Sequence, residues 1–273
     1  MPPFAITPCT LPDGPQIARN NVLAFWTDAT WVQCWRGKPR DYVAAQAAKR
    51  GKANLLRDRA HRRHLIAVDE GTGEVVGYAR WLLPCSGEAT GESEGIGKDG
   101  GKGCGCEALW REGRVPDVEE EVRVEAERES AGADWEVDDL GGLDGPIRGM
   151  ERRLLEGRRY MGMLILSPPG VQGYVWITDA ASVLDYLCVP PEFRRRGIAS
   201  ALVRRGLEET DRLGLDTFVM SMRAGVSVYQ KAGFVLLDHV LIDASSRGGD
   251  RDYGAWFLER KCTSREGDEP SSR

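Results

Sequence analysis

A strand, a glycine-containing turn and an amphipathic helix follow one another in residues 184–214, and this succession constrains the fold most strongly. Leu184 to Val189 is a short, mostly apolar run that predicts a strand ending at two prolines. Residues 198–212 then place apolar side chains on one face of a helix, and Gly214 follows as its C-terminal cap. The run from Thr217 to Met222 predicts a further strand. The segment therefore predicts alternating strand and helix, as in α/β folds.

The turn before this helix has the composition of an anion-binding site. The first N–H groups of a helix have no partner within the helix, and the helix dipole makes that end positive. Gly197 lets the backbone approach a bulky anion because glycine has no Cβ, and three arginines, 194–196, precede it. The pattern Arg-x-x-Gly-x-Ala is common by itself, so its meaning depends on the strand before it and the helix after it. In that context a pyrophosphate is the expected ligand.

Further elements are expected on both sides of this segment. Periodicity and turn residues predict strands at 4–7, 64–69, 75–83 and 234–242, and helices at 16–26, 41–59 and 225–232. Apolar residues between 147 and 155 indicate one more amphipathic helix, and the charged run 117–130 indicates a solvated helix.

Composition changes sharply in the middle of the chain. Residues 86–113 are mostly Gly, Glu, Ser and Lys, and residues 133–146 are rich in Gly and Asp. Such segments bury too little apolar surface to offset the entropy lost when they become ordered. We therefore expect a single domain over residues 1–262, interrupted by a disordered insertion at about 85–146 and followed by a disordered tail at 263–273.

Charge and hydropathy exclude several classes of protein. The 273 residues include 37 basic and 42 acidic side chains, and the net charge of −5 provides no basic field for nucleic acid. No apolar run approaches the ~18 residues that span a bilayer, so no membrane association is expected. Seven scattered cysteines, and an N-terminus without a signal-peptide pattern, favour a reducing, cytoplasmic setting.

Two motifs resemble those of the GNAT superfamily of acyl-CoA-dependent N-acyltransferases. Residues 189–202, Val-Pro-Pro-Glu-Phe-Arg-Arg-Arg-Gly-Ile-Ala-Ser-Ala-Leu, are similar to its pyrophosphate-binding motif, Q/R-x-x-G-x-G/A. Residues 229–234, Tyr-Gln-Lys-Ala-Gly-Phe, look like its second hallmark, a tyrosine followed shortly by Gly-Phe. The similarity is close over about 184–237, looser before Pro84, and looks closest to proteins of filamentous fungi. Ala199 stands where many members have glycine, and the family pattern offers no role for the insertion.

The resemblance implies a mixed, mostly antiparallel central sheet, flanked by helices, whose central strands splay apart to admit acetyl-CoA. In this chain the splayed strands would be 184–189 and 217–222. The strand backbone at Leu187, Cys188 and Val189 would bind the pantetheine arm, and the loop and the first helical turn would bind the pyrophosphate. The cofactor-binding residues implied for the loop and helix are Arg194, Arg195, Arg196, Gly197, Ile198, Ala199 and Ser200.

Acetyl transfer to an amine needs a proton for the departing thiolate and a group that takes a proton from the amine. Tyr229 matches the family tyrosine, and a phenol with a pKa near ~10 is protonated at neutral pH and can donate to a thiolate. Asp185 shares a strand face with Leu187 and Val189 by period-two alternation, which makes it a candidate base. The alternative for Asp185 is a structural pairing with an arginine.

The expected function is transfer of an acetyl group from acetyl-CoA to a primary amine of a small molecule, by direct attack in a ternary complex. Acetylation of a protein N-terminus or lysine is one alternative, and a non-catalytic acyl-CoA-binding or interaction module is another. No metal is expected, because Cys104 and Cys106 lack the further ligands of a zinc site. Trp26, Trp31 and Trp35 are candidates for an acceptor pocket or for core packing. The acidic balance mildly favours a cationic acceptor, and a homodimer stays open.

Overall fold

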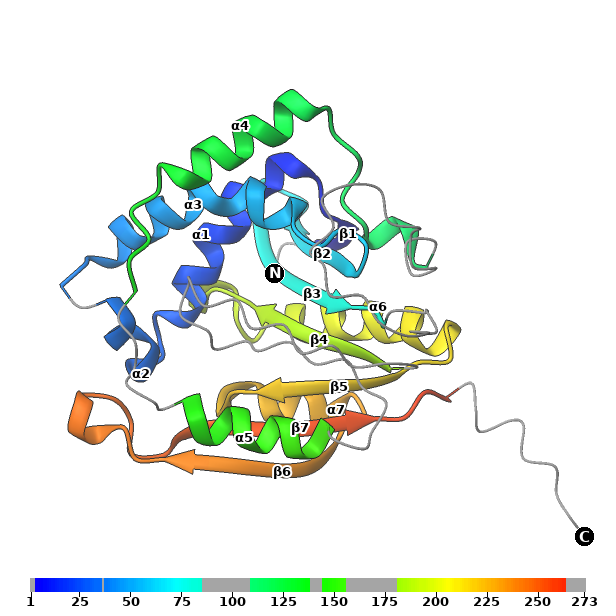
Figure 1. The fold of residues 1–273 in the computed structure, drawn as a ribbon. Helices are drawn as coiled ribbons and strands as arrows, with labels where there is room; N and C mark the ends of the chain where they lie inside the picture. The colour runs from blue at the N-terminus through cyan, green and yellow to red at the C-terminus, as the bar shows by residue number, and fades with distance from the viewer. Residues whose placement is uncertain (1–2, 36, 85–108, 138–143, 156–180, 264–273) are drawn as a thin grey trace, which may run out of the picture.

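The computed structural model describes residues 3–35, 37–84, 109–137, 144–155 and 181–263, which form one sheet with helices on both faces (Figure 1). The strands lie in the order β1-β2-β3-β4-β5-β7-β6. From β1 to β7 their bounds are Phe4–Pro8, Arg62–Asp69, Val75–Leu82, Ala181–Cys188, Asp216–Ser221, Val235–Ile242 and Tyr253–Arg260. Neighbouring strands are antiparallel except β4 and β5, which are parallel. The mixed, mostly antiparallel sheet expected from the sequence is therefore confirmed.

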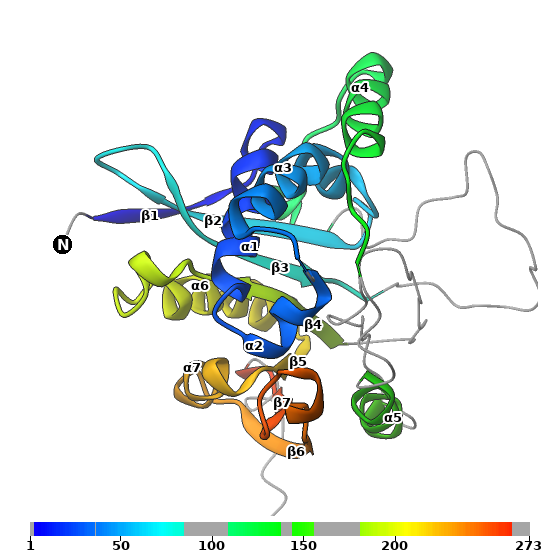
Figure 2. The same cartoon turned by 90° about the vertical axis from the view of Figure 1, so that its left-hand side faces the viewer.

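Helices divide between the two faces of the sheet, as Figure 2 shows. Their bounds from α1 to α7 are Gly14–Phe25, Ala29–Val32, Arg40–Leu56, Glu120–Ala131, Asp144–Leu155, Ile198–Arg212 and Val226–Lys231. Helices α6 and α7 cover one face, where Leu202 and Tyr229 pack with Leu184 of β4. Helices α1 and α5 cover the other face: Ile17 packs near β2 and β3, and Ile147 packs near β5 and β7. Helix α3 lies against α1, and α4 lies against α3.

The central strands β4 and β5 diverge along their length. They pair only at their first residues, from Ala181 opposite Asp216 to Val183 opposite Phe218. Beyond Val183, β4 continues to Cys188 alongside β3, and β5 continues to Ser221 alongside β7. The splayed central strands expected from the sequence are therefore present, and the gap opens toward the N-terminus of α6.

The elements expected from the sequence are present, with ends shifted by a few residues, but two parts of the fold differ. Strand β7 lies between β5 and β6 and was not expected, although its residues 253–258 are rich in apolar and aromatic side chains. Helix α4 is less solvated than expected, because Ala126 is buried and Lys52 of α3 forms a 3.1 Å ion pair with Glu129.

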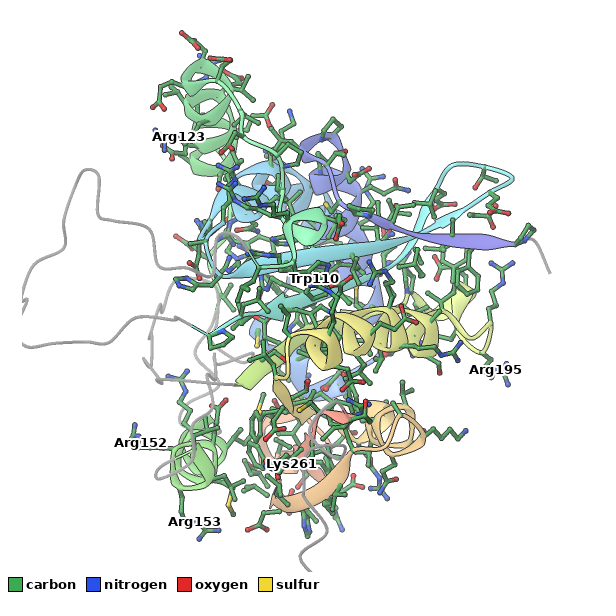
Figure 3. The ribbon with its side chains drawn as sticks, turned by 90° about the vertical axis from the view of Figure 1, so that its right-hand side faces the viewer. Trp110, Arg123, Arg152, Arg153, Arg195 and Lys261 are labelled. Atoms are coloured by element: carbon green, nitrogen blue, oxygen red, sulfur yellow. The ribbon has the colours of Figure 1, made fainter. Side chains whose placement is uncertain are left out.

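The expectation of a disordered insertion is wrong for the described residues 109–137. Trp110 is only 1% exposed and its ring lies 6.0 Å from that of Trp81, inside the cluster beneath α6 (Figure 3). The buried Arg63 donates two hydrogen bonds, of 3.0 and 2.7 Å, to the carbonyl oxygen of Leu109, and Arg59 donates two to that of Val115. The remaining residues of the expected insertion, 85–108 and 138–143, lie outside the described residues, as does most of the expected tail.

One glycine on α6 allows that helix to lie directly on the sheet. A Cβ on Gly206 would come within 2.0–2.5 Å of the Trp81 ring, which is fully buried on β3. Glycine at this helix position permits close approach at a modest cost in helix propensity. The contact fixes the position of α6, and with it the anion-binding end of the helix.

Candidate functional site

The gap between β4 and β5 forms a cleft with a volume of about 500 Å³. Its walls come from the end of α1, from β4, from the loop and first turn of α6, and from β5 and α7. Most of the residues singled out in the sequence line this one cleft: Asp185, Leu187, Cys188, Val189, Arg194, Arg195, Gly197, Ile198, Ala199, Ser200 and Tyr229. Arg196 is the exception, since it is absent from the walls. The fold therefore brings the two motifs, which lie 30 residues apart in the sequence, to opposite sides of one space.

The loop before α6 has a backbone shaped for an anion. Arg195 and Gly197 both have positive φ angles, of 62° and 82°, and Gly197 is the N-terminal cap of α6. The first helical bond runs from the N–H of Ala201 to the carbonyl of Gly197, so the N–H groups of residues 198–200 precede the helical ladder. Apart from Gly197 itself and its two neighbours in the chain, no described residue has a heavy atom within 4 Å of the Cβ position of Gly197, which leaves open space in front of these donors. Such concave backbone segments bind phosphates.

The three arginines of the loop make different contacts. Arg194 donates to the carbonyl oxygens of Val189 and Ala24, at 3.1 and 2.8 Å, and to the Thr27 hydroxyl at 3.2 Å. These bonds connect the loop to the end of α1, so the Arg194 guanidinium acts mainly as a structural connection. Arg196 stacks over the Phe193 ring at 5.5 Å. Arg195 is exposed at the outer end of α6 (Figure 3). Of the three side chains, Arg195 is the one left beside the cleft without a protein partner among the described residues.

Tyr229 lies on α7 and contributes to the opposite wall of the cleft. Its ring is 5% exposed and packs edge-on against Phe234 at 5.6 Å. No residue of the described chain hydrogen-bonds to its hydroxyl, so the donor is available to a ligand. Burial raises the pKa of Tyr229 above its ordinary value, which keeps the phenol protonated at neutral pH. The side chain is therefore held as a proton donor that faces the cleft.

Asp185 does not share a face with Leu187 and Val189, so the expectation from period-two alternation is wrong. The register of β3 and β4 shifts at this point, with Arg80 opposite Tyr186 and Trp81 opposite Leu184, so Asp185 has no partner residue on β3. Leu187 and Val189 pack toward α6. The Asp185 carboxylate is completely buried and instead accepts three hydrogen bonds, between 2.7 and 3.0 Å, from Arg80. A bulge of this kind re-aims a side chain, which alternation alone cannot predict.

This pair also settles the charge of Arg80. Burial alone would lower the pKa of Arg80, but the Asp185 carboxylate outweighs it and raises that pKa above its ordinary value. Arg80 is therefore charged and bound to Asp185, as expected from the alternative in which Asp185 is the structural partner of an arginine.

Cys188 faces α1, between Leu187 and Val189, which face α6. Its Sγ lies 2.6 Å from Oδ1 of Asn21, and burial raises the pKa of its thiol. A protonated, buried thiol is a poor nucleophile, so Cys188 serves packing and its backbone remains the part offered to a ligand.

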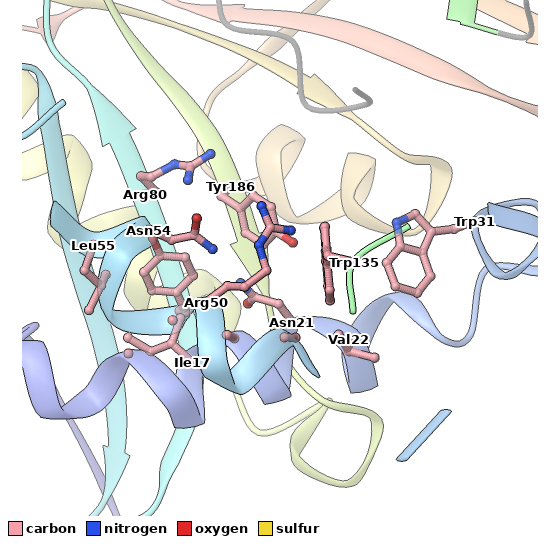
Figure 4. Close-up of a pocket in the computed structure, with 15 residues that line it drawn as sticks. Ile17, Asn21, Val22, Trp31, Arg50, Asn54, Leu55, Arg80, Trp135 and Tyr186 are labelled. Carbon is pink, nitrogen blue, oxygen red and sulfur yellow. The ribbon is translucent and has the colours of Figure 1, made fainter. Parts of the chain in front are cut away.

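A second cavity, of about 150 Å³, adjoins the cleft on the α1 and α3 side of the sheet (Figure 4). Tyr186 of β4 contributes to the walls of both spaces. Of the three tryptophans considered in the sequence, Trp31 lines this cavity, whereas Trp35 is buried in the cluster of α1 and α3. Arg50 and Trp135 also line it, and sequence reasoning missed both. Nothing in their local sequence distinguishes them, since Arg50 sits in a basic, alanine-rich helix.

The described residues contain neither a cluster suited to a metal ion nor a helix suited to a membrane. Within the described ranges, no group of three or more His, Cys, Asp and Glu side chains is arranged to hold a metal ion. Among the helices the structure describes, none is both long and apolar enough to cross a membrane.

Comparison with known proteins agrees with the fold. Residues 148–246 match the family model described as an acetyltransferase (GNAT) domain. A solved structure described as histone acetyltransferase HPA2 and related acetyltransferase, from Corynebacterium glutamicum, is similar with a TM-score of 0.51 and 16% identity, covering 100% of both chains. A phosphinothricin acetyltransferase from Sinorhizobium meliloti, solved with AcCoA, is similar with a TM-score of 0.44 and 10% identity, covering 98% of this chain and 94% of that one. No curated protein matches significantly. Residues 148–246 are therefore similar to an acetyltransferase (GNAT) domain, and the described residues share the fold of the Corynebacterium glutamicum structure.

Proposed function

We propose that the chain is an N-acetyltransferase that moves an acetyl group from acetyl-CoA to a primary amine of a small molecule. The observation that carries this proposal is the cleft between β4 and β5, which has unpaired helix N–H groups at one side and the Tyr229 hydroxyl at the other. The amine and acetyl-CoA bind together, and the amine attacks the acetyl group directly. A buried, protonated Cys188 supports direct attack over a covalent acetyl-cysteine route.

The residues of the cleft fit acetyl-CoA. The N–H groups of residues 198–200 and the open space before Gly197 suit the pyrophosphate, and Arg195 adds positive charge beside it. The unpaired end of β4, at Leu187 to Val189, offers backbone groups to the amide-containing arm, because β5 has turned away from it. When bound, acetyl-CoA would supply a thioester whose carbonyl carbon accepts the amine nitrogen while the carbon–sulfur bond breaks.

The backbone and side-chain groups of the cleft then have separate roles. A backbone N–H of β4 donates to the acetyl carbonyl oxygen and stabilises the charge that develops there. The Tyr229 hydroxyl donates its proton to the departing sulfur, and the attacking amine loses a proton to water. Asp185 holds Arg80 in place, since its oxygens are already occupied by three hydrogen bonds. Asp185 is therefore a positioning residue in this proposal, and its candidacy as the base yields to that alternative.

The organisation and setting of the chain are part of the same proposal. Residues 1–262 form one catalytic domain, in which the segment 109–137 belongs to the structure and not to a removable insertion. Four described cysteines, Cys9, Cys34, Cys188 and Cys262, are buried and free, which is compatible with a reducing, cytoplasmic setting.

The test is to incubate the purified full chain with acetyl-CoA and a panel of amines and peptides while measuring free thiol. Acceptor-dependent thiol release with small amines supports the proposal. Release with peptides alone would move the substrate class to proteins. Binding of acetyl-CoA without release for any acceptor would make the chain a non-catalytic binding module and refute the proposed activity.

A further inference from the structure

The small cavity beside the cleft has an unbalanced charge. Its described lining contains two guanidinium groups, those of Arg50 and Arg80, and no carboxylate. Arg80 is neutralised by Asp185, as described above. Arg50, on α3, lies over the ring of Trp135 with 4.5 Å between its Cζ and the ring centroid. Among the described residues, no carboxylate pairs with Arg50, so one positive charge of the cavity remains without a counter-charge.

The surroundings of Arg50 make this charge costly. Burial, and to a smaller extent the neighbouring positive charge of Arg57, lower the pKa of Arg50 to about 10. A partly buried cation is stabilised when an anion enters and pairs with it, because the desolvation cost has already been incurred. The face of Trp135 adds a cation–π contact that orients the guanidinium without neutralising it.

The position of the cavity connects this charge to the cleft. Helix α1 forms a wall of both spaces, with Asn21 in the cavity and Phe25 in the cleft, and Tyr186 lies between them. The Phe25 and Tyr186 rings pack edge-on at 5.4 Å. A molecule seated in the cavity therefore reaches the acetyl-transfer space past Tyr186, on the side opposite to the α6 loop. Figure 4 shows the Arg50 guanidinium directed toward Tyr186 and Trp135 in this region.

We propose that the cavity is the acceptor subsite and that the acceptor is an amine carrying a single anionic group, a carboxylate above all, which binds Arg50. This inference rests on the proposed acetyl transfer and adds the substrate class. The planar guanidinium suits a two-point contact with a carboxylate, and the amide groups of Asn21 and Asn54 line the same space. Ile17, Val22 and Trp31 add apolar surface to the wall, which disfavours a second charge on the acceptor.

The charge of Arg50 affects binding of the acceptor more than the net negative charge of the whole chain does. The net charge of −5 by itself mildly favours a cationic acceptor. Exposed charges farther away than about 8 Å are largely screened at physiological ionic strength, whereas a partly buried charge is not. Specificity for the acceptor therefore follows from Arg50 and not from the surface total.

The experiment measures binding of N-acetylated products by calorimetry, so that it does not depend on turnover. The probes are N-acetylglycine, N-acetyl-β-alanine and 4-acetamidobutyrate, which differ in spacing, each compared with its neutral carboxamide. 2-Acetamidoethylphosphonate tests whether the anion is a phosphonate or phosphate group instead. The variants are Arg50→Met, which removes the charge, Arg50→Lys, which keeps the charge without the planar fork, and Arg57→Met as the control. Arg57 ends the same helix but does not line the cavity.

We expect at least one carboxylate to bind about 10–100 times more tightly than its carboxamide, as for loss of a hydrogen bond to a charged group. Arg50→Met should abolish that preference, Arg50→Lys should retain part of it with a native circular dichroism spectrum, and Arg57→Met should change it less than threefold. Tighter binding of the phosphonate, also lost in Arg50→Met, would support the anionic subsite and assign the anion. Equal binding of acids and carboxamides, or binding of neither, would overturn the inference. Thiol release with cationic amines alone would overturn it while leaving acetyl transfer intact. Anion-selective binding without any thiol release would uphold the subsite and refute the proposed activity.

Discussion

Trp110 provides the sharpest test of whether the middle of the chain belongs to the folded domain. The side chain is 1% exposed and lies in the cluster beneath α6, beside Trp81. Trp110→Ala should cost about 3–5 kcal/mol in the free energy of unfolding, as for other fully buried aromatic side chains. The indole N–H of Trp110 has no hydrogen-bond partner among the described residues, so the loss comes from packing and not from a broken hydrogen bond. Trp110→Phe should therefore cost less than Trp110→Ala.

The measurement is urea and thermal denaturation of the full chain, followed by far-ultraviolet circular dichroism. A loss of this size corresponds to a decrease of about 6–20 °C in the melting temperature of a domain of this length. Val124→Ala is the matched control, because it lies in the same segment but its side chain is 54% exposed. The control should change the free energy of unfolding by about 0.5 kcal/mol or less. If Trp110→Ala is as stable as Val124→Ala, residues 109–113 do not pack as described and the expected disordered insertion would be restored.

Two further predictions concern the site and the pH dependence of stability. Tyr229→Phe should lower the turnover rate at the low end of the ~10²–10⁴-fold range of positioned proton donors and leave acetyl-CoA affinity nearly unchanged, whereas the exposed Tyr42→Phe should be neutral. Steady-state kinetics with acetyl-CoA would detect this, and full activity of Tyr229→Phe would remove its role as acid. Burial raises the pKa of Glu151 to about 7, so the carboxyl group holds its proton more tightly in the native protein than in the unfolded chain. The protonated carboxyl group therefore contributes fully to stability below about pH 4.5, and this contribution is lost as the pH rises through 7. Glu151→Gln should therefore raise the melting temperature at about pH 8.5 far more than at about pH 4.5, and equal shifts at both values would contradict this.

Local sequence predicted the parts of the fold whose structure is determined locally. The strand, loop and helix around Gly197 form as expected because the prolines, the glycine and the apolar face act within a few residues of one another. The cleft itself could be predicted only from the family resemblance, since it forms because β4 and β5 pair at one end alone. The register shift at Asp185 could not be predicted from the sequence, because a bulge depends on the partner strand.

The sequence did not reveal single residues whose contacts differ from those expected from the composition of their segments. The average composition of residues 86–113 is polar and rich in glycine. This average gives no sign that one residue of the segment, Trp110, is buried by contacts with β3 and α6. Arg50 was missed for a similar reason. Its sequence neighbours make it one of several basic residues on a helix, and its lack of a counter-charge appears only when α1, β4 and Trp135 close the cavity around it. Both cases depend on contacts between residues far apart in the chain, which periodicity does not report.

The central claim is that the cleft between β4 and β5 binds acetyl-CoA with its pyrophosphate at the start of α6. Calorimetric titration of acetyl-CoA into the wild-type chain, Gly197→Glu and Gly214→Glu tests it directly. The two glycines have similar positive φ angles, of 82° and 67°, so the backbone strain of the two substitutions is matched. Apart from each glycine and its chain neighbours, no described residue has a heavy atom within 4 Å of either Cβ position. Only Gly197 lies at the cleft; Gly214 follows the other end of the same helix. We predict that Gly197→Glu abolishes binding while Gly214→Glu binds as the wild type does, both with native circular dichroism spectra. Equal affinity of Gly197→Glu and the wild type would place acetyl-CoA elsewhere and contradict the account.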